Sequence, residues 1–160
     1  MRLPGEIIQG ILARGALVLL RVYLGVVFLL DALSKLQHIP GSDFAGFLQH
    51  RALETGHAFY LPFLETVALP HADVIGSLLG WAEALVGVTL IAGITTRFSA
   101  GVAMILTLNY MFANGMWFWT PGSYDAACFV IALALLIGAA GRTFGIDAVL
   151  ARRWQRSPLW

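Results

Sequence analysis

Four ionisable side chains lie inside the longest apolar stretches of this sequence, and they are the first candidates for chemistry. They are Arg21, Asp31, Lys35 and Glu83. Burying a charge in a membrane-length apolar segment costs free energy, so such a residue is expected to have a function or an internal partner. A carboxylate close to a cation can hold and release a proton, or stabilise charge on a bound molecule.

Three of these residues belong to one predicted helix. At about 100° per residue, Arg21 and Lys35 fall on the same stripe of that helix. Asp31 lies beside the stripe and is placed to pair with Lys35 one turn further on. Arg21 should be nearer the cytoplasmic end of the helix, and Asp31 and Lys35 nearer its outer end.

Glu83 shares a helix face with small residues. Gly76, Gly80 and Gly87 recur on its side of the predicted second span. Small residues at this spacing allow the backbone of another helix to come close. The pattern predicts that Glu83 lies near the middle of the membrane, in a groove lined by glycine.

Asn109 and Tyr110 add hydrogen-bonding groups near the middle of the predicted third span. An apolar slot with a few such groups suits a quinone ring, and a nearby carboxylate could relay its protons. We therefore expect catalytic roles for Glu83, Arg21 and Lys35, and cofactor-binding roles for Asn109, Tyr110 and Asp31. Two alternatives stay open: the charges form an ion-pair network that fixes helix register, and Asn109 makes only an interhelical hydrogen bond.

Several other chemistries are disfavoured by what the sequence lacks. Cys128 is the only cysteine, so the chain has no Cys-x-x-Cys pair or internal disulfide. No histidine lies in a predicted span to ligate haem, and there is no glycine-rich dinucleotide or phosphate loop. The net charge of +1 gives no sign of a nucleic-acid partner. The histidine spacings match no standard metal site; the four are His38, His50, His57 and His71.

The elements that must position these residues are membrane helices. Hydrophobic residues make up 59% of the chain and charged residues 12%, with a mean hydropathy of +0.79. A stretch of about 20 apolar residues can span a bilayer. Four such stretches predict an all-α integral membrane four-helix bundle formed by one domain, 1–160; they cover about 16–36, 74–95, 98–119 and 123–140.

The arginine distribution predicts the orientation of the bundle, because basic residues mark the cytoplasmic side. With both termini inside, seven arginines share that side: Arg2, Arg14, Arg97, Arg142, Arg152, Arg153 and Arg156. A cleaved signal peptide is not expected, because the first apolar run is too long. The long outer loop, about Gln37 to Asp73, should hold one short interfacial or re-entrant element at Ala58–Leu69. Trp117, Trp119 and Tyr124 should form an outer aromatic belt.

Three segments resemble the DoxX-like family of membrane proteins. The first span reads LLRVYLGVVFLLDALSKL, and the second region reads FLETVALPHADVIGSLLGWAEALVGVTLIAGITTR. The tail GAAGRTFGIDAVLARR is similar to the family's ending of the fourth span. The resemblance covers roughly Arg14 to Arg153, and it is closest to the DoxD-type members, the small subunit of thiosulfate:quinone oxidoreductase.

This resemblance implies a four-helix bundle in a prokaryotic cytoplasmic membrane, with Arg21, Lys35, Glu83 and Arg97 at motif positions. It implies a membrane subunit of a quinone-linked oxidoreductase that passes electrons from thiosulfate to quinone, with the bilayer and other membrane subunits as partners. The alternative is a non-catalytic accessory or scaffold subunit of a larger respiratory or photosynthetic membrane complex. A small solute transporter is less favoured, because no internal repeat or pair of broken helices is evident.

Overall fold

A computed structural model of the chain describes residues 4–37, 42–138 and 145–147. All secondary structure elements formed by these residues are helical. The long helices are α1 (Pro4–Gln37), α5 (Ala72–Ala92), α6 (Thr96–Ala113) and α7 (Tyr124–Gly138). Short helical segments connect α1 to α5: α2 (Ser42–Phe47), η1 (Leu48–Ala52), α3 (Leu53–Thr55), α4 (Leu61–Phe63) and η2 (Leu64–Ala68).

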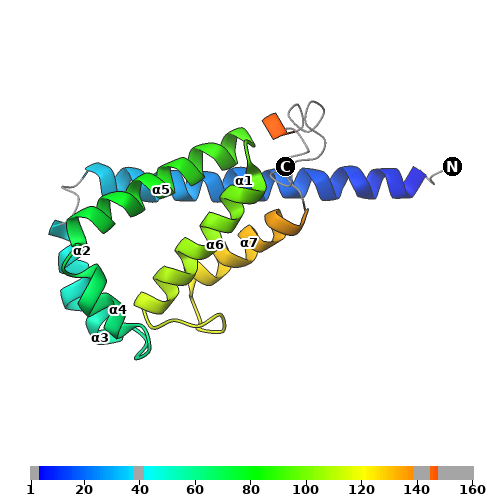
Figure 1. Ribbon diagram of the computed structural model, residues 1–160. Coiled ribbons are helices and arrows are strands. Elements are labelled where there is room, and N and C mark those ends of the chain that lie inside the picture. Colours follow the sequence, from blue (N-terminus) through cyan, green and yellow to red (C-terminus); the bar gives the residue numbers. More distant parts are fainter. Residues whose placement is uncertain (1–3, 38–41, 139–144, 148–160) are drawn as a thin grey trace.

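The four long helices pack around one apolar core. The most extensive contact joins α1 and α5, which run antiparallel, and the next joins α6 and α7 (Figure 1). Contacts of α1 with α7 and of α5 with α6 complete the arrangement. The side chains at its centre are buried, and they include Leu24, Phe28, Leu90, Ala103, Leu106, Ala132 and Leu135.

Gly25 and Gly87 set how closely α1 and α5 approach. A Cβ atom on Gly87 would lie 2.8 Å from both the Gly25 carbonyl oxygen and the Leu29 nitrogen. A Cβ atom on Gly25 would lie 2.9 Å from the Gly87 carbonyl oxygen. Backbone packs on backbone here, so any side chain would push the helices apart. The glycine face predicted for the second span therefore does contact another helix.

Among the described residues, two helices are long and apolar enough to cross a membrane: α1, over Gln9–Gln37, and α5. Large apolar side chains on their outer faces are exposed, as lipid contact requires; they include Leu19, Leu30, Leu78, Trp81 and Leu85. The third and fourth predicted spans correspond to α6, of 18 residues, and α7, an apolar helix of 15 residues.

The predicted third span, 98–119, is wrong at its end, because α6 stops at Ala113. Gly115 follows with a positive φ of 64°, and a Cβ atom there would lie 1.9 Å from the Thr55 carbonyl oxygen. The chain must therefore leave the helix to pass the α3 segment. At the start of α7 the Ser123 hydroxyl accepts a hydrogen bond from the Ala126 amide at 3.3 Å, so Ser123 caps this helix.

The connection between α1 and α5 is more structured than expected. In place of one short element it holds five helical segments, which we call the helical cap (residues 42–69). The cap lies at the end of the molecule where α1 finishes, next to the α6–α7 connection (Figure 1). Its apolar residues Leu48, Ala52, Leu64 and Ala68 form a second small core together with Ala113 at the end of α6.

Aromatic side chains join the cap to the α6–α7 connection. The His57 ring packs against Trp117, with centroids 4.2 Å apart, and its Nε2 atom lies 3.0 Å from the Met116 carbonyl oxygen. The His57 amide also donates to the Phe112 carbonyl oxygen at 3.0 Å. Two of the three residues of the predicted aromatic belt, Trp117 and Trp119, stack on one another.

Candidate functional site

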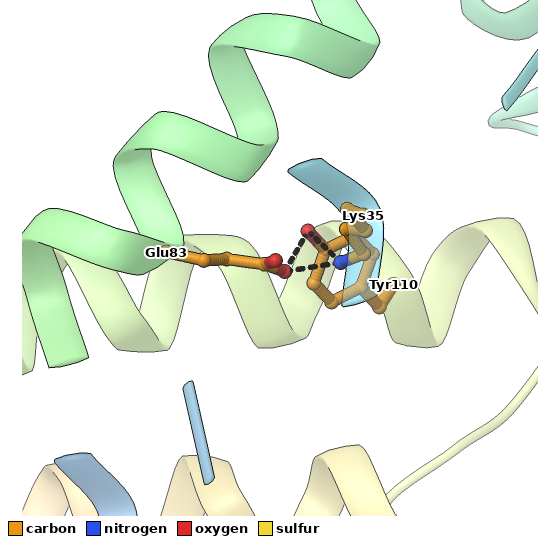
Figure 2. A network of polar contacts seen from close by, with 3 residues as sticks. All are labelled: Lys35, Glu83 and Tyr110. Atoms are coloured by element: carbon orange, nitrogen blue, oxygen red, sulfur yellow. Dashed lines mark hydrogen bonds and ion pairs between the residues drawn. The ribbon is translucent and has the colours of Figure 1, made fainter. Parts of the chain in front are cut away.

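Lys35, Glu83 and Tyr110 come together from three different helices and form what we call the Glu83 triad (Figure 2). The Lys35 ammonium on α1 and the Tyr110 hydroxyl on α6 both donate to one carboxylate oxygen of Glu83, Oε1. The Lys35 Nζ atom also donates to the Tyr110 hydroxyl at 3.2 Å and lies 4.5 Å from the centre of its ring. The triad thus joins α1, α5 and α6 at one point.

The triad has a buried side and an exposed side. The Glu83 side chain is 1% exposed, whereas the Lys35 side chain is 43% exposed. A lysine can bury its aliphatic stem and leave its charge at an edge. Lys35 therefore connects a fully buried carboxylate to the surface of the protein.

The second Glu83 oxygen, Oε2, differs from Oε1 in its hydrogen bonding. It is buried, and no group of the described residues forms a hydrogen bond with it. Buried polar atoms in proteins are nearly always hydrogen-bonded, so an exception needs an explanation.

Asn109 lies next to Tyr110 on α6 and is tied to the helical cap. The Tyr60 hydroxyl donates to the Asn109 side-chain oxygen. Burial raises the pKa of Tyr60, so its phenol stays protonated and able to donate. Asn109 therefore bonds to the cap, not to another long helix. The sequence carries no signal for Tyr60, because its partner is far away along the chain.

A small cavity of about 40 Å³ lies between the cap, α5 and α6. Asn109 and Tyr110 line it together with apolar side chains, among them Phe44, Phe63, Leu64 and Leu79. A cavity that takes benzene has a volume of roughly 150 Å³, and a single water needs about 10–15 Å³. The cavity therefore has room for a few water molecules. A ring the size of benzene could enter only if the cap moved.

Arg21 does not join the triad. It lies about 21 Å before Lys35 along α1, at 1.5 Å per residue, and it is buried. A Cβ atom on Gly93 would lie 2.6 Å from one of its terminal nitrogens, so the guanidinium packs against the end of α5. Its electrostatic partner is Asp147. The structure therefore separates Arg21 from Glu83.

Asp147 was not among the predicted site residues. Its two carboxylate oxygens accept hydrogen bonds from the Thr95 and Thr96 amides, at 2.6 and 2.8 Å, and its own amide donates to Gly93 at 2.8 Å. An acid at a helix N-terminus satisfies free amides and complements the helix dipole. Asp147 thus holds residues 145–147 against the α5–α6 turn, and it interacts electrostatically with Arg21.

Asp31 is exposed on α1, one turn before Lys35. The expected Asp31–Lys35 pair is not the ion pair that forms, because Lys35 turns to Glu83. The structure thus brings together Lys35, Glu83 and Tyr110, with Asn109 on the adjacent side, and leaves Asp31 at the edge.

The DoxX family profile matches residues 16–116, well over half of the chain, and this range includes the whole triad. The chain belongs to the DoxX family. DoxX family members are membrane proteins, which agrees with the two apolar helices of membrane-spanning length. No curated protein and no solved structure shows a significant match.

In this DoxX chain the triad has the chemistry of a proton-holding site. A carboxylate held by an ammonium and a phenol can exchange a proton with a bound molecule while its position stays fixed. Tyr110 links the triad to the cavity, because its side chain takes part in both. The arrangement therefore places a buried acid–base group beside an apolar space under the cap.

Proposed function

We propose that this DoxX chain is a membrane subunit of a quinone-linked oxidoreductase in a prokaryotic cytoplasmic membrane. The observation that carries the proposal is the buried Glu83 carboxylate, held by Lys35 and Tyr110 between apolar helices. An ionisable group in such a place is expected to handle ions, protons or a ligand.

The proposal includes four spans, formed by α1, α5, α6 and α7, with both termini in the cytoplasm. The cap and the α6–α7 connection share one end of the molecule, and the α5–α6 turn, which precedes Arg97, lies away from them (Figure 1). This separation supports a topology with the aromatic-rich end outside and the turn before Arg97 inside, in agreement with the positive-inside rule.

The polar groups of the triad and of Asn109 are of the kinds that a quinone site uses, and the cavity of about 40 Å³ must widen before a quinone ring can enter. When bound, quinone supplies an acceptor for two electrons and two protons. Glu83 holds and releases a proton, Lys35 balances negative charge near it, and Tyr110 fixes the carboxylate. Asn109 and Tyr110 are the polar residues that line the cavity. Asp31 offers a further carboxylate at the exposed edge, and we assign Arg21 a structural role with Asp147.

The resemblance of the sequence to DoxD-type members extends the proposal to thiosulfate as the electron donor. In that form the electron donor is oxidised to tetrathionate with the help of a second subunit, and this chain provides the quinone side of the reaction.

A non-catalytic scaffold subunit is the second candidate, and a specific observation favours it. The Lys35–Glu83 ion pair and the Gly25–Gly87 contact both join α1 to α5, so the charges could serve only to fix the register of these helices. Removing one partner of a buried ion pair destabilises a protein by about 3–5 kcal/mol, and less where one partner is exposed.

The variant Glu83→Gln separates the two candidates. The complex is purified gently from native membranes, and its yield, melting temperature, bound quinone and quinone reduction are measured on one sample. A quinone site predicts normal assembly with loss of bound quinone and of electron transfer. A scaffold predicts low yield and a lower melting temperature. Unchanged quinone content and electron transfer in a stable variant would rule out the catalytic proposal. The matched control is Glu65→Gln, the same change at an exposed residue of the cap.

A further inference from the structure

Charged side chains surround the exposed edge of the Glu83 triad. Asp31 on α1 is exposed one turn before Lys35, and Asp125 in the first turn of α7 is partly buried. Asp125 interacts electrostatically with Asp31, Lys35 and Glu83, so the start of α7 lies near the triad. Asp31 interacts with Lys35 and Glu83 in the same way. We call Asp31, Lys35 and Asp125 the charged mouth.

The charged mouth is unsuited to contact with lipid. Asp31 and Lys35 are both exposed, and both lie in the apolar stretch of α1. Charged side chains within membrane spans almost always face the bundle interior or a water-filled space. The connection before α7 is exposed at Pro121 and Gly122 and leads directly to Asp125, which gives water a route to this point.

The opposite side of Glu83 is closed by apolar packing. The next turns of α5 carry buried residues: Val86, Gly87 and Leu90. At Gly87 the backbone of α5 meets the backbone of α1, which leaves no space between the helices. Hydroxyl groups in this half bond to helix carbonyls or to one another. On the described parts of the long helices, no acidic or basic side chain lies between Glu83 and the contact of Arg21 with Asp147.

The Glu83 carboxylate has a free position for a proton. Its Oε2 atom is buried without a hydrogen-bond partner among the described residues, whereas Oε1 accepts from Lys35 and Tyr110. A proton gained at Oε2 turns the carboxylate into a carboxylic acid and leaves both hydrogen bonds to Oε1 in place. Holding a proton there requires no cavity beside the carboxylate.

We propose that the charged mouth is the water-filled entrance of a proton path that joins Glu83 to the outer surface and is closed to the cytoplasm. One proton moves from the outer water to the Glu83 carboxylate, and no other bond changes in the net step. Asp31 and Asp125 are positioning residues, because their negative charge concentrates cations at the entrance. This inference rests on the proposed function, and it names the side of the membrane from which the protons of that reaction come.

Thiol labelling tests whether the mouth holds water, because a cysteine reacts as the thiolate, which forms in water and not in lipid. In a Cys128→Ala background, Asp31→Cys should react with an impermeant cationic thiol reagent added to intact cells, to the same extent as Pro121→Cys. The matched control is Leu30→Cys, the neighbouring exposed position, which faces lipid and should lose this reaction. Equal results at positions 30 and 31, or reaction of Asp31→Cys only after the membrane is opened, would overturn the proposal.

Silver ions test the path from the mouth to Glu83, because Ag⁺ is a small cation that binds thiols. In chloride-free buffer, Ag⁺ should block Glu83→Cys in right-side-out vesicles, and the block should be lost in inside-out vesicles. Asp125→Asn should slow the block roughly tenfold at low salt, and less at high salt, where charges are screened. Glu65→Gln, which changes an exposed acid of the cap, should keep the rate. Equal block from both sides, or equal rates for these two variants, would contradict the proposed path.

The failures can be told apart. Should Glu83→Cys not fold, the labelling of Asp31→Cys and Leu30→Cys decides alone, since both positions are exposed. None of these measurements uses quinone. A chain with the expected labelling that binds no quinone overturns the proposed function and keeps the water-filled mouth. A chain that binds quinone while Asp31→Cys stays unlabelled keeps the function and overturns the mouth.

Discussion

Each side chain around Glu83 contributes differently to holding a carboxylate away from water. Lys35 neutralises its charge from a half-exposed position, and Tyr110 adds a neutral donor from the core side. Hydrogen bonds to a buried charged group are worth more than those between neutral groups. The phenol is therefore expected to contribute measurably to stability, independently of the ion pair.

Tyr110→Phe tests this contribution. It removes one donor to Glu83 and leaves the ring in place, so the free energy of unfolding should fall by about 1–3 kcal/mol. The melting temperature of the purified chain in a fixed detergent measures the loss, with Tyr23→Phe as the matched control. Equal melting temperatures for the two variants would show that Tyr110 does not support the carboxylate.

Tyr60→Phe tests the link between the cap and α6. The change removes the hydrogen bond to Asn109, and a neutral bond of this kind contributes about 0.5–1.5 kcal/mol. Amide hydrogen exchange should become faster in the cap, residues 42–69, and stay unchanged in α5. If the cap exchanges at the wild-type rate, Tyr60 does not hold it closed.

The sequence predicts which residues are unusual, but not all of their partners. Lys35 and Glu83 can be identified from the sequence, because each is a charged residue within an apolar stretch, where burial costs free energy. Lys35 pairs with Glu83 and not with Asp31 because of the way α1 and α5 pack. The spacing of residues along one helix gives no information about that packing. Tyr60 and Asp147 were missed for the same reason, since each bonds to residues far away in the chain.

The glycines at the contact between α1 and α5 differ in how tightly they pack. A Cβ atom on Gly80 would lie 3.1 Å from the flexible Leu36 side chain, which could shift slightly to accommodate it. Cβ atoms on Gly25 and Gly87 would lie within 3.0 Å of backbone atoms, which cannot move aside in this way. The pattern of small residues thus predicts the correct face of α5, and the structure identifies which glycines control the distance.

Gly87→Ala should therefore destabilise the protein, by about 1–3 kcal/mol, through overpacking. Gly101→Ala on α6 is the matched control, because no atom lies within 4 Å of its Cβ position. In a helix interior that second change should be neutral or stabilising by up to about 1 kcal/mol. Thermal unfolding of both variants side by side provides the measurement, and similar values for both would contradict a close α1–α5 contact.

Helix ends were less predictable than helix positions. Apolar length predicts where α6 runs, but the helix stops early because Gly115 must pass close to Thr55 of the cap. That constraint comes from a segment the sequence indicates only as a loop. The five cap segments are short, and short helices depend on packing that local propensity does not reveal.

The orientation of the whole molecule can be tested by labelling. In a Cys128→Ala background, a cysteine at Pro121, in the exposed α6–α7 connection, should react with an impermeant thiol reagent added to intact cells. A cysteine at Arg14, which is exposed near the N-terminal end of α1, should react only after the membrane is opened. The opposite pattern would reverse the proposed topology.

The length of α1 has a consequence for the cytoplasmic side of the protein. The helix, Pro4–Gln37, has 34 residues and extends about 51 Å, against a hydrocarbon thickness of about 30 Å. With Arg14 at the cytoplasmic surface, the turns that precede it continue about 15 Å beyond the bilayer. Trypsin added to inside-out membrane vesicles should therefore cleave at Arg14, and protection of this site would contradict the proposed orientation.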